Sequence, residues 1–324
     1  MKSIDRRRLL QGALSGALAL PFMRAWGAAG TTPAGAGSGR AAAAGPAPAA
    51  TVTRLNDHMA VIGGADWNVL ALIGADGVLL VDSGAPGAAA AVTAALASLG
   101  AAPVQTLINT HWHPHATGGN EVFARAGAKI IAHAKVRQWL SVPHWVPAED
   151  RYEGARPKEA WPTQVYYDHG SLTALGQHID YGYLLEAHTD GDSYVHFQDA
   201  NVIAVGGVAS PDRDPELDWF SGAWVGGRID ALTRLLKLGD ARTHYVATTG
   251  APATPAQLQA ELDTMTLLYG RLVGYITKGM NTAEMLQAGI MENTGRTWQD
   301  PQAFMYAAQK GMWAHYNTLS PEIV

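Results

Sequence analysis

The first regular pattern along the chain is a series of short apolar runs, bounded by Gly, Asp and Asn, that begins near residue 51. The runs read HMAVIGG, NVLALIG and GVLLVDSG, and a turn, ADG, separates the second from the third. Runs of this length between turn residues predict buried strands. The next segment, APGAAAAVTAALASLG, has Pro86 near its start and Gly100 past its end, which predicts a helix. PVQTLINT then predicts another buried strand.

Strands and helices are expected through the rest of the chain. AKIIAH predicts a strand, a short helix follows to about Leu140, and the Trp- and Pro-rich stretch 141–164 is interpreted as irregular. Further strands are expected at 164–167, 181–187, 194–198, 201–205 and in THYVATT, and helices at 227–238 and over most of 255–316. Strands in both halves, each set followed by helices, predict an α/β fold with two packed sheets covered by helices.

The N-terminal segment has the order of a secretory signal: a basic run at 6–8, an apolar stretch to Phe22, and small residues after it. The run DRRRLLQ resembles a twin-arginine export signal, with Arg6 and Arg7 as the pair. A membrane anchor is the alternative, but the apolar stretch is shorter than the roughly 20 residues that a span needs. We expect a signal peptide over 1–29, export to the periplasm or a similar location, and no stable membrane span after cleavage.

A change of composition marks the start of the folded domain. Residues 30–50 are Ala, Gly and Pro with almost no apolar bulk, which predicts a disordered linker. The folded domain is therefore expected over 51–324, with a helical extension at its C-terminal end. The sequence leaves open whether the helices of this extension cover a cleft or bind a protein partner.

Charge and cysteine content narrow the classes of function. The net charge of -5, with only 16% charged residues, leaves no basic face for nucleic acid. The chain has 324 residues, of which 48% are hydrophobic, enough for a sizeable core. It has no cysteine, so neither disulfides nor thiolate zinc ligands contribute, and stability rests on the core or on a metal.

Three histidines stand at alternate positions in THWHPHATGGN, directly after a predicted strand: His111, His113 and His115. In an extended segment, side chains at alternate positions point the same way, and Pro114 favours an extended conformation at His113. Neutral imidazoles are common zinc ligands, and three of them with one open position form a hydrolytic zinc site. The pattern favours a metal site or a former one over unrelated core or surface histidines.

These residues and several later motifs resemble the metallo-beta-lactamase fold superfamily, whose signature H-x-H-x-D-H follows a strand and usually precedes T-G-G-N. The resemblance continues through VDSG, AHTDGDSYVHF, NVIAVGG and YVATTGAP, in the same order, over roughly residues 52–275. It implies an alpha/beta-beta/alpha four-layer sandwich with mixed sheets and the metals at one sheet edge.

The resemblance also implies one retained metal site and one altered site. The family's ligands for the first metal correspond to His111, His113 and His188. The positions of its ligands for the second metal hold other residues: His115, Ala116, Gly207 and Thr249. One zinc ion is therefore the expected cofactor.

The function implied is an exported zinc-dependent hydrolase of a small-molecule substrate. A zinc-bound water would attack an ester, lactone, thioester or amide carbonyl. The family's Asp that orients this water is absent, so His115 is the candidate base. Asp190 is a second candidate, unless it and Asp192 cap a turn between strands.

Two alternatives remain. A catalytically inactive binding or partner protein on a decayed site would keep the three histidines for packing, without a metal; the residues at 115, 207 and 249 favour it. Redox or sulfur chemistry at iron fits less well, since the dinuclear iron members need carboxylates that are missing here.

Three further features bear on the site. Asp82, in VDSG, matches a carboxylate that orients the metal loop in the family, with an ordinary strand-end turn as the alternative. Trp112 lies between two candidate ligands and is the best candidate for a cleft wall. The acids of DRDPELD, 212–218, lack the Gly and the spacing of a calcium loop, and we interpret this segment as solvated.

Overall fold

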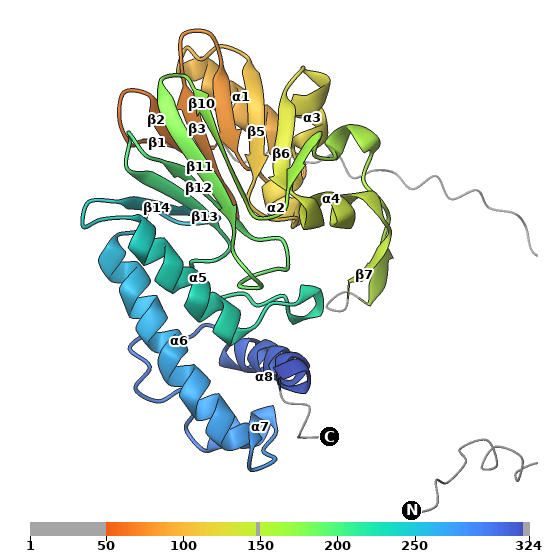
Figure 1. Cartoon of the computed structure of the whole chain (residues 1–324), viewed down its shortest axis with the longest axis vertical. Helices are drawn as coiled ribbons and strands as arrows, with labels where there is room; N and C mark the ends of the chain where they lie inside the picture. The colour runs from red at the N-terminus through yellow and green to blue at the C-terminus, as the bar shows by residue number, and fades with distance from the viewer. Residues whose placement is uncertain (1–49, 147–149, 320–324) are drawn as a thin grey trace, which may run out of the picture. The chain divides into compact units, whose positions relative to one another are not determined.

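Two β-sheets packed face to face form the centre of the fold (Figure 1). The structure is a computed structural model that describes residues 50–146 and 150–319. The predicted signal peptide, 1–29, lies outside the described residues, as does the predicted linker except for its last residue. Among the described helices, none is both long and apolar enough to cross a membrane.

The first sheet has seven strands in the order β1-β2-β3-β4-β5-β6-β9. Strands β1 to β4 pair antiparallel, and β4, β5, β6 and β9 run parallel. Their bounds are Thr51–Arg54, Met59–Gly63, Asn68–Ile73, Val78–Val81, Val104–Asn109, Lys129–His133 and Gln164–Tyr166. Because β4 and β5 are parallel, Asp82 and Thr110, which follow them, emerge at the same edge of the sheet.

The second sheet has five strands in the order β10-β11-β12-β13-β14. The pairs are antiparallel except for β13 and β14, which are parallel, so this sheet is also mixed. The bounds are His169–Ala174, Gln177–Tyr183, Ser193–Phe197, Val202–Gly206 and His244–Ala247. The parallel pair again carries the residues that follow it, Gly207 and Thr248, to one edge.

Helices cover the outer faces of both sheets. The α-helices are α1 (Ala89–Ser98), α2 (Pro114–Thr117), α3 (Asn120–Arg125), α4 (Ala134–Ser141), α5 (Val225–Leu238), α6 (Pro255–Ile276), α7 (Thr282–Gln287) and α8 (Pro301–Leu319). Two short 3-10 helices, η3 (Lys158–Ala160) and η4 (Trp219–Ser221), and a hairpin, β7 (His144–Val146) with β8 (Arg151–Glu153), complete the described fold. The predicted four-layer alpha/beta-beta/alpha arrangement is therefore present.

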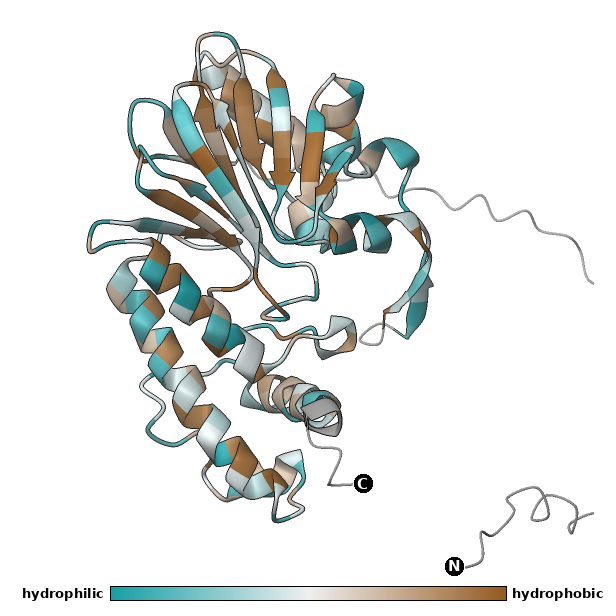
Figure 2. Ribbon diagram, in the orientation of Figure 1, coloured by the Kyte–Doolittle hydropathy of each residue, from teal (hydrophilic) through white to brown (hydrophobic). Residues whose placement is uncertain are grey.

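Successive side chains of a strand point to opposite faces of its sheet, so neighbouring residues pack in different layers of the sandwich. In β2, Val61 packs between the two sheets, whereas its neighbour Ile62 packs in the cluster that includes α1. On the far side, Leu232 of α5 and Leu268 of α6 belong to the cluster that covers the second sheet. Figure 2 shows the hydrophobic residues concentrated in the strands, while α5 and α6 alternate between hydrophobic and hydrophilic residues. This pattern is expected for helices with one buried face.

Three local predictions were wrong or incomplete. The strand expected at 181–187 is β11, Gln177–Tyr183, so the residues after Tyr183 leave the sheet and form a loop toward His188. The stretch 141–164, interpreted as irregular, contains the β7–β8 hairpin. Strand β10 was not predicted, because its edge position leaves its side chains alternately exposed and half-buried, without a continuous apolar run.

Candidate metal centre

Four histidine side chains converge at the edge where the two sheets meet the loops. One ring nitrogen from each of His111, His113, His115 and His188 lies within 4.8 Å of all the others. The first follows β5, the next two lie at the start of α2, and His188 lies in the loop before β12. Three of the rings are buried and His115 is half-buried. Residues separated by more than seventy positions are thus brought together in one cluster.

The local backbone differs from the fully extended segment that was predicted. His113 is extended, with φ -58° and ψ 151°, as Pro114 favours. Pro114 then begins the one-turn helix α2, so His115 lies in a helical turn. The turn brings His115 back toward His111, and their Nε2 atoms are 2.8 Å apart. The three histidines converge, but the third does so by a turn and not by alternation.

The His188 ring is oriented so that one nitrogen faces the cluster without a partner. Its Nδ1 donates to the backbone carbonyl of Glu216 at 2.9 Å. Its Nε2 is buried and has no hydrogen-bond partner among the described residues. Burial, together with the neighbouring His113, lowers the pKa of His188. A buried imidazole nitrogen with a free lone pair is typical of a metal ligand, because leaving it unpaired costs free energy.

His113 is held from outside by a carboxylate. Its Nε2 lies 3.1 Å from Oδ2 of Asp218, which leaves Nδ1 as the nitrogen that faces the cluster. Desolvation opposes the charged form of His113, but the hydrogen bond to Asp218 and the charges of Glu216, Asp218 and Asp192 together outweigh it, so the pKa of His113 is raised. The same contact lowers the pKa of Asp218 against the effect of its own burial. A carboxylate on the outer nitrogen of a ligating histidine is a common means of orienting the ring.

His111 is oriented by a two-step contact to Asp82. The backbone N–H and the hydroxyl of Thr110 donate to the two Asp82 oxygens at 2.8 and 2.7 Å. Thr110 Oγ1 lies 2.9 Å from His111 Nδ1, so this oxygen accepts from the ring, and Nε2 is the nitrogen that faces the cluster, 2.8 Å from Nε2 of His115. Asp82 has the left-handed φ of 62°, and burial raises its pKa to about 7. Asp82 thus contacts His111 through Thr110, next to the loop that carries the histidines.

The arrangement fits a zinc ion. With Zn–N distances of about 2.0–2.1 Å, tetrahedral ligand atoms lie roughly 3.3 Å apart; the four ring nitrogens lie within 4.8 Å of one another, although the 2.8 Å between the Nε2 atoms of His111 and His115 is a hydrogen-bond distance. Burial and the adjacent imidazoles hold the pKa of His111 well below its usual value and lower that of His115 to about 3. Both rings are therefore neutral at pH 7, as metal binding requires.

The other positions that the resemblance assigned to a second metal, Gly207, Thr249 and Ala116, lie around this cluster. A Cβ atom at Gly207 would lie 2.1 Å from Cδ2 of His188, so His188 occupies the space of a side chain there. Thr249 lines a hollow of about 130 Å³ together with His115, His188 and Gly207. The Ala116 side chain is buried, and its carbonyl accepts from the backbone N–H and the hydroxyl of Ser83.

The structure does not bring Asp190 into the cluster. Its carboxylate accepts from the Trp139 indole at 2.7 Å and pairs with Lys135 at 3.3 Å. Asp192 caps the loop, accepting from the backbone N–H groups of Ala187, His188 and Thr189. Asp192 therefore positions His188 through the backbone.

Sequence reasoning missed two acids in 212–218, the segment interpreted as solvated. Asp218 is half-buried against His113, and Glu216, although it reaches solvent, lines the hollows on both sides of the cluster. Desolvation raises the pKa of Glu216, but the imidazoles of His188, His113 and His115 outweigh it and lower the pKa overall. The only sequence signal was the alternation of acids, which solvated loops share.

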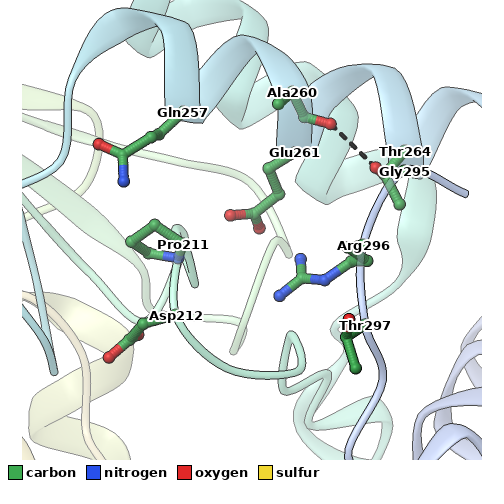
Figure 3. A pocket seen from close by; sticks show the side chains of 9 residues that line it. All are labelled: Pro211, Asp212, Gln257, Ala260, Glu261, Thr264, Gly295, Arg296 and Thr297. Carbon is green, nitrogen blue, oxygen red and sulfur yellow. Dashed lines mark hydrogen bonds between the residues drawn. The ribbon is translucent and has the colours of Figure 1, made fainter.

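A buried ion pair supports the loops behind the cluster. Arg228 and Glu261 form bonds of 2.9 and 2.7 Å from Nε and a terminal nitrogen to Oε1. Arg228 also donates to the carbonyl of Gly207 at 3.0 Å, and Glu261 Oε2 accepts from the backbone N–H of Ser210 at 2.8 Å. Figure 3 shows Glu261 and Arg296 facing the same pocket, which has a volume of about 320 Å³. The Arg228–Glu261 ion pair therefore links α5 and α6 to the loop after β13.

Comparisons with known proteins agree with this architecture. Residues 64–271 match the family model described as the metallo-beta-lactamase superfamily. Among solved structures, a metallo-beta-lactamase from Pontibacter korlensis is similar, with a TM-score of 0.56 and 17% sequence identity, over 67% of this chain and 99% of that one. No curated protein sequence gives a significant match. At this identity, the structural likeness concerns the fold alone.

Proposed function

Because the chain belongs to the metallo-beta-lactamase superfamily, we propose that it is a hydrolase with a single zinc ion held by His111, His113 and His188. The observation that carries the proposal is the buried, unpartnered Nε2 of His188, which faces two other imidazoles whose outer nitrogens are already bonded. A bound zinc would supply a Lewis acid that lowers the pKa of a water molecule to about 7.

The residues around the ligands divide the remaining tasks. Asp218, Thr110 and the carbonyl of Glu216 hold the three rings in the orientation that metal binding needs. His115 and Glu216 line the hollows beside the ligands. The Glu216 carboxylate is placed to accept a proton from an attacking water, whereas the lowered pKa of His115, about 3, makes its imidazole a weak proton acceptor. The proposed substrates are esters, lactones, thioesters or amides, and the proposed location, from the N-terminal segment, is periplasmic or otherwise exported.

A second candidate function follows from the position of His115. Its Nε2 is close enough to that of His111 for both to bind one ion. Four protein ligands would fill a tetrahedral zinc and leave no open position for water, as in structural sites. The protein would then be a metal-stabilised binding protein without hydrolytic activity.

The test is metal analysis of the mature protein purified without chelator, beside a His111→Ala, His188→Ala double variant and a His115→Gln variant. The hydrolase proposal expects about one zinc per chain in the wild type, none in the double variant, and unchanged zinc affinity in His115→Gln. Hydrolysis of aryl esters is then compared in wild type, His115→Gln and Glu216→Gln. A large loss of zinc affinity in His115→Gln would identify the four-histidine site, and no zinc in any protein would refute both candidates.

A further inference from the structure

A pocket of about 480 Å³ opens beside the cluster and touches His113 and His115. Four segments form its walls: residues 112–115, the β7–β8 hairpin, the loop around η4, and α8. The hairpin contributes Trp145, η4 contributes Trp219 and Phe220, and α8 contributes the small side chains of Ala303 and Ala307. The hairpin and α8 lie outside the two-sheet core, so elements beyond the two sheets shape the pocket.

The chemistry of the walls is mainly aromatic. Trp112, Trp145, Trp219 and Phe220 all line the pocket. Trp112 is held firmly, stacked on Trp139 at a centroid distance of 4.6 Å and an interplanar angle of 12°. Phe220 keeps 42% of its surface exposed, so a ring-bearing ligand placed against it would gain by removing this apolar surface from water.

The charges in the pocket argue against an anionic ligand. Arg151 lies 3.6 Å from Glu153, and Asp218 is held by His113 at 3.1 Å, so these charges are matched within the protein. Glu216 remains as a carboxylate at the boundary between the pocket and the histidines. In the metal-free protein, a carboxylate on the ligand would meet this like charge at short range, where the surrounding protein screens it less than bulk water does.

We infer that this pocket selects substrates that carry an uncharged aromatic ring next to the scissile carbonyl. The inference rests on the proposed hydrolase, since the pocket borders the histidines that would hold the zinc. Trp145 and Phe220 are specificity-determining residues in this account, and they come from two elements outside the loop that carries His111, His113 and His115.

Binding to metal-free protein tests the pocket without turnover. The probes are N-(2-naphthyl)acetamide, which is uncharged and hydrolyses slowly, and the same amide with a carboxylate on the distal ring; dissociation constants are measured by calorimetry. We expect the neutral probe to bind at least about tenfold more tightly than the carboxylate probe. Trp145→Ala and Phe220→Ala should each weaken the neutral probe by about tenfold. Trp313→Ala is the matched control, because Trp313 lies on α8, is half exposed and does not line the pocket.

Turnover by zinc-loaded protein gives the second comparison. Trp145→Ala and Phe220→Ala should lower kcat/KM for 2-naphthyl acetate by about tenfold and leave ethyl acetate within about twofold, since only the former fills the pocket. Comparing each variant with wild type on the same ester cancels the intrinsic reactivity of the esters. Equal binding of both probes, or naphthyl binding and turnover unaffected by both variants, would overturn the inference. Selective binding without any turnover would support the pocket and contradict the proposed hydrolase.

Discussion

Replacing Glu261 by glutamine tests how strongly the buried ion pair supports the metal loops. The Arg228 side chain is 0% exposed and that of Glu261 is 2% exposed. The glutamine side chain would keep the shape, but it has one acceptor oxygen for two sets of donors, Arg228 on one side and the Ser210 N–H on the other. The variant also leaves the Arg228 charge buried without a counter-charge.

The magnitude follows from breaking a buried pair on one side only, which costs about 3–5 kcal/mol. For a domain of this size, each kcal/mol lowers Tm by about 2–4 °C, so we expect a decrease of about 6–20 °C. Arg228 donates to the carbonyl of Gly207, which adjoins His188, so zinc affinity should fall as well. The zinc-free and zinc-loaded proteins therefore both need to be measured.

The assay is urea unfolding and thermal unfolding by circular dichroism, with zinc affinity from competition with a chromogenic chelator. Asp263→Asn is the matched control, because Asp263 is an exposed carboxylate on the same helix; its effect should stay within about 0.5 kcal/mol. The Arg228→Met, Glu261→Leu double variant should be more stable than Glu261→Gln, because no charge remains buried alone. If Glu261→Gln unfolds within about 1 kcal/mol of wild type, the argument from burial is wrong.

Three further changes test the cluster and its supports. Gly207→Ala should displace His188 and lower zinc binding at least about tenfold, since the new Cβ would lie 2.1 Å from its ring; zinc titration that matches wild type would contradict this. Burial raises the folded-state pKa of Asp82 to about 7. In the zinc-free protein, the stability that Asp82 contributes should therefore be fully present below its unfolded-state pKa. This contribution should be lost as the pH rises toward 7, and the loss should be at most about 4 kcal/mol. The difference in unfolding free energy between wild type and Asp82→Asn should therefore decrease from pH 4 to pH 8, and a constant difference would exclude the shift. Asn120→Ala should destabilise the fold by about 1–3 kcal/mol for each buried partner left unpaired, since the Asn120 amide donates to Asn109 and to the Ala160 carbonyl; urea unfolding measures the loss.

The sequence predicted the sheets well where one physical pattern dominates. Strands β2 and β4 are buried along their whole length, so their apolar runs stand out against the turn residues around them. Strand β10, HGSLTA, alternates with period 2, but Leu172 is its only large apolar residue, and the β7–β8 hairpin lies among Trp and Pro residues; neither contains an apolar run. Tertiary pairing, and not local preference, makes these segments strands.

The candidate site likewise contains residues that the sequence identified and residues that it did not. His111, His113 and His115 are visible because they are neighbours in sequence, and the motif around them led to His188. The contact of His113 with Asp218 joins residues 105 positions apart. It depends on the course of the loop after β13, which crosses from one sheet to the ligands supported by the other. No local pattern encodes that course, so the acids of 212–218 had the same appearance as a solvated loop.

The end of β13 shows why glycine stands at two successive positions, 206 and 207. Gly206 has a φ of 55°, and a Cβ atom on it would lie 2.4 Å from the Thr110 hydroxyl that orients His111. At the next position, a Cβ atom would overlap the His188 ring. Both glycines thus allow the chain to pass directly against supports of two ligands from different sheets. A side chain at 207 and His188 in its present place therefore exclude each other, so the position of His188 depends on glycine at 207.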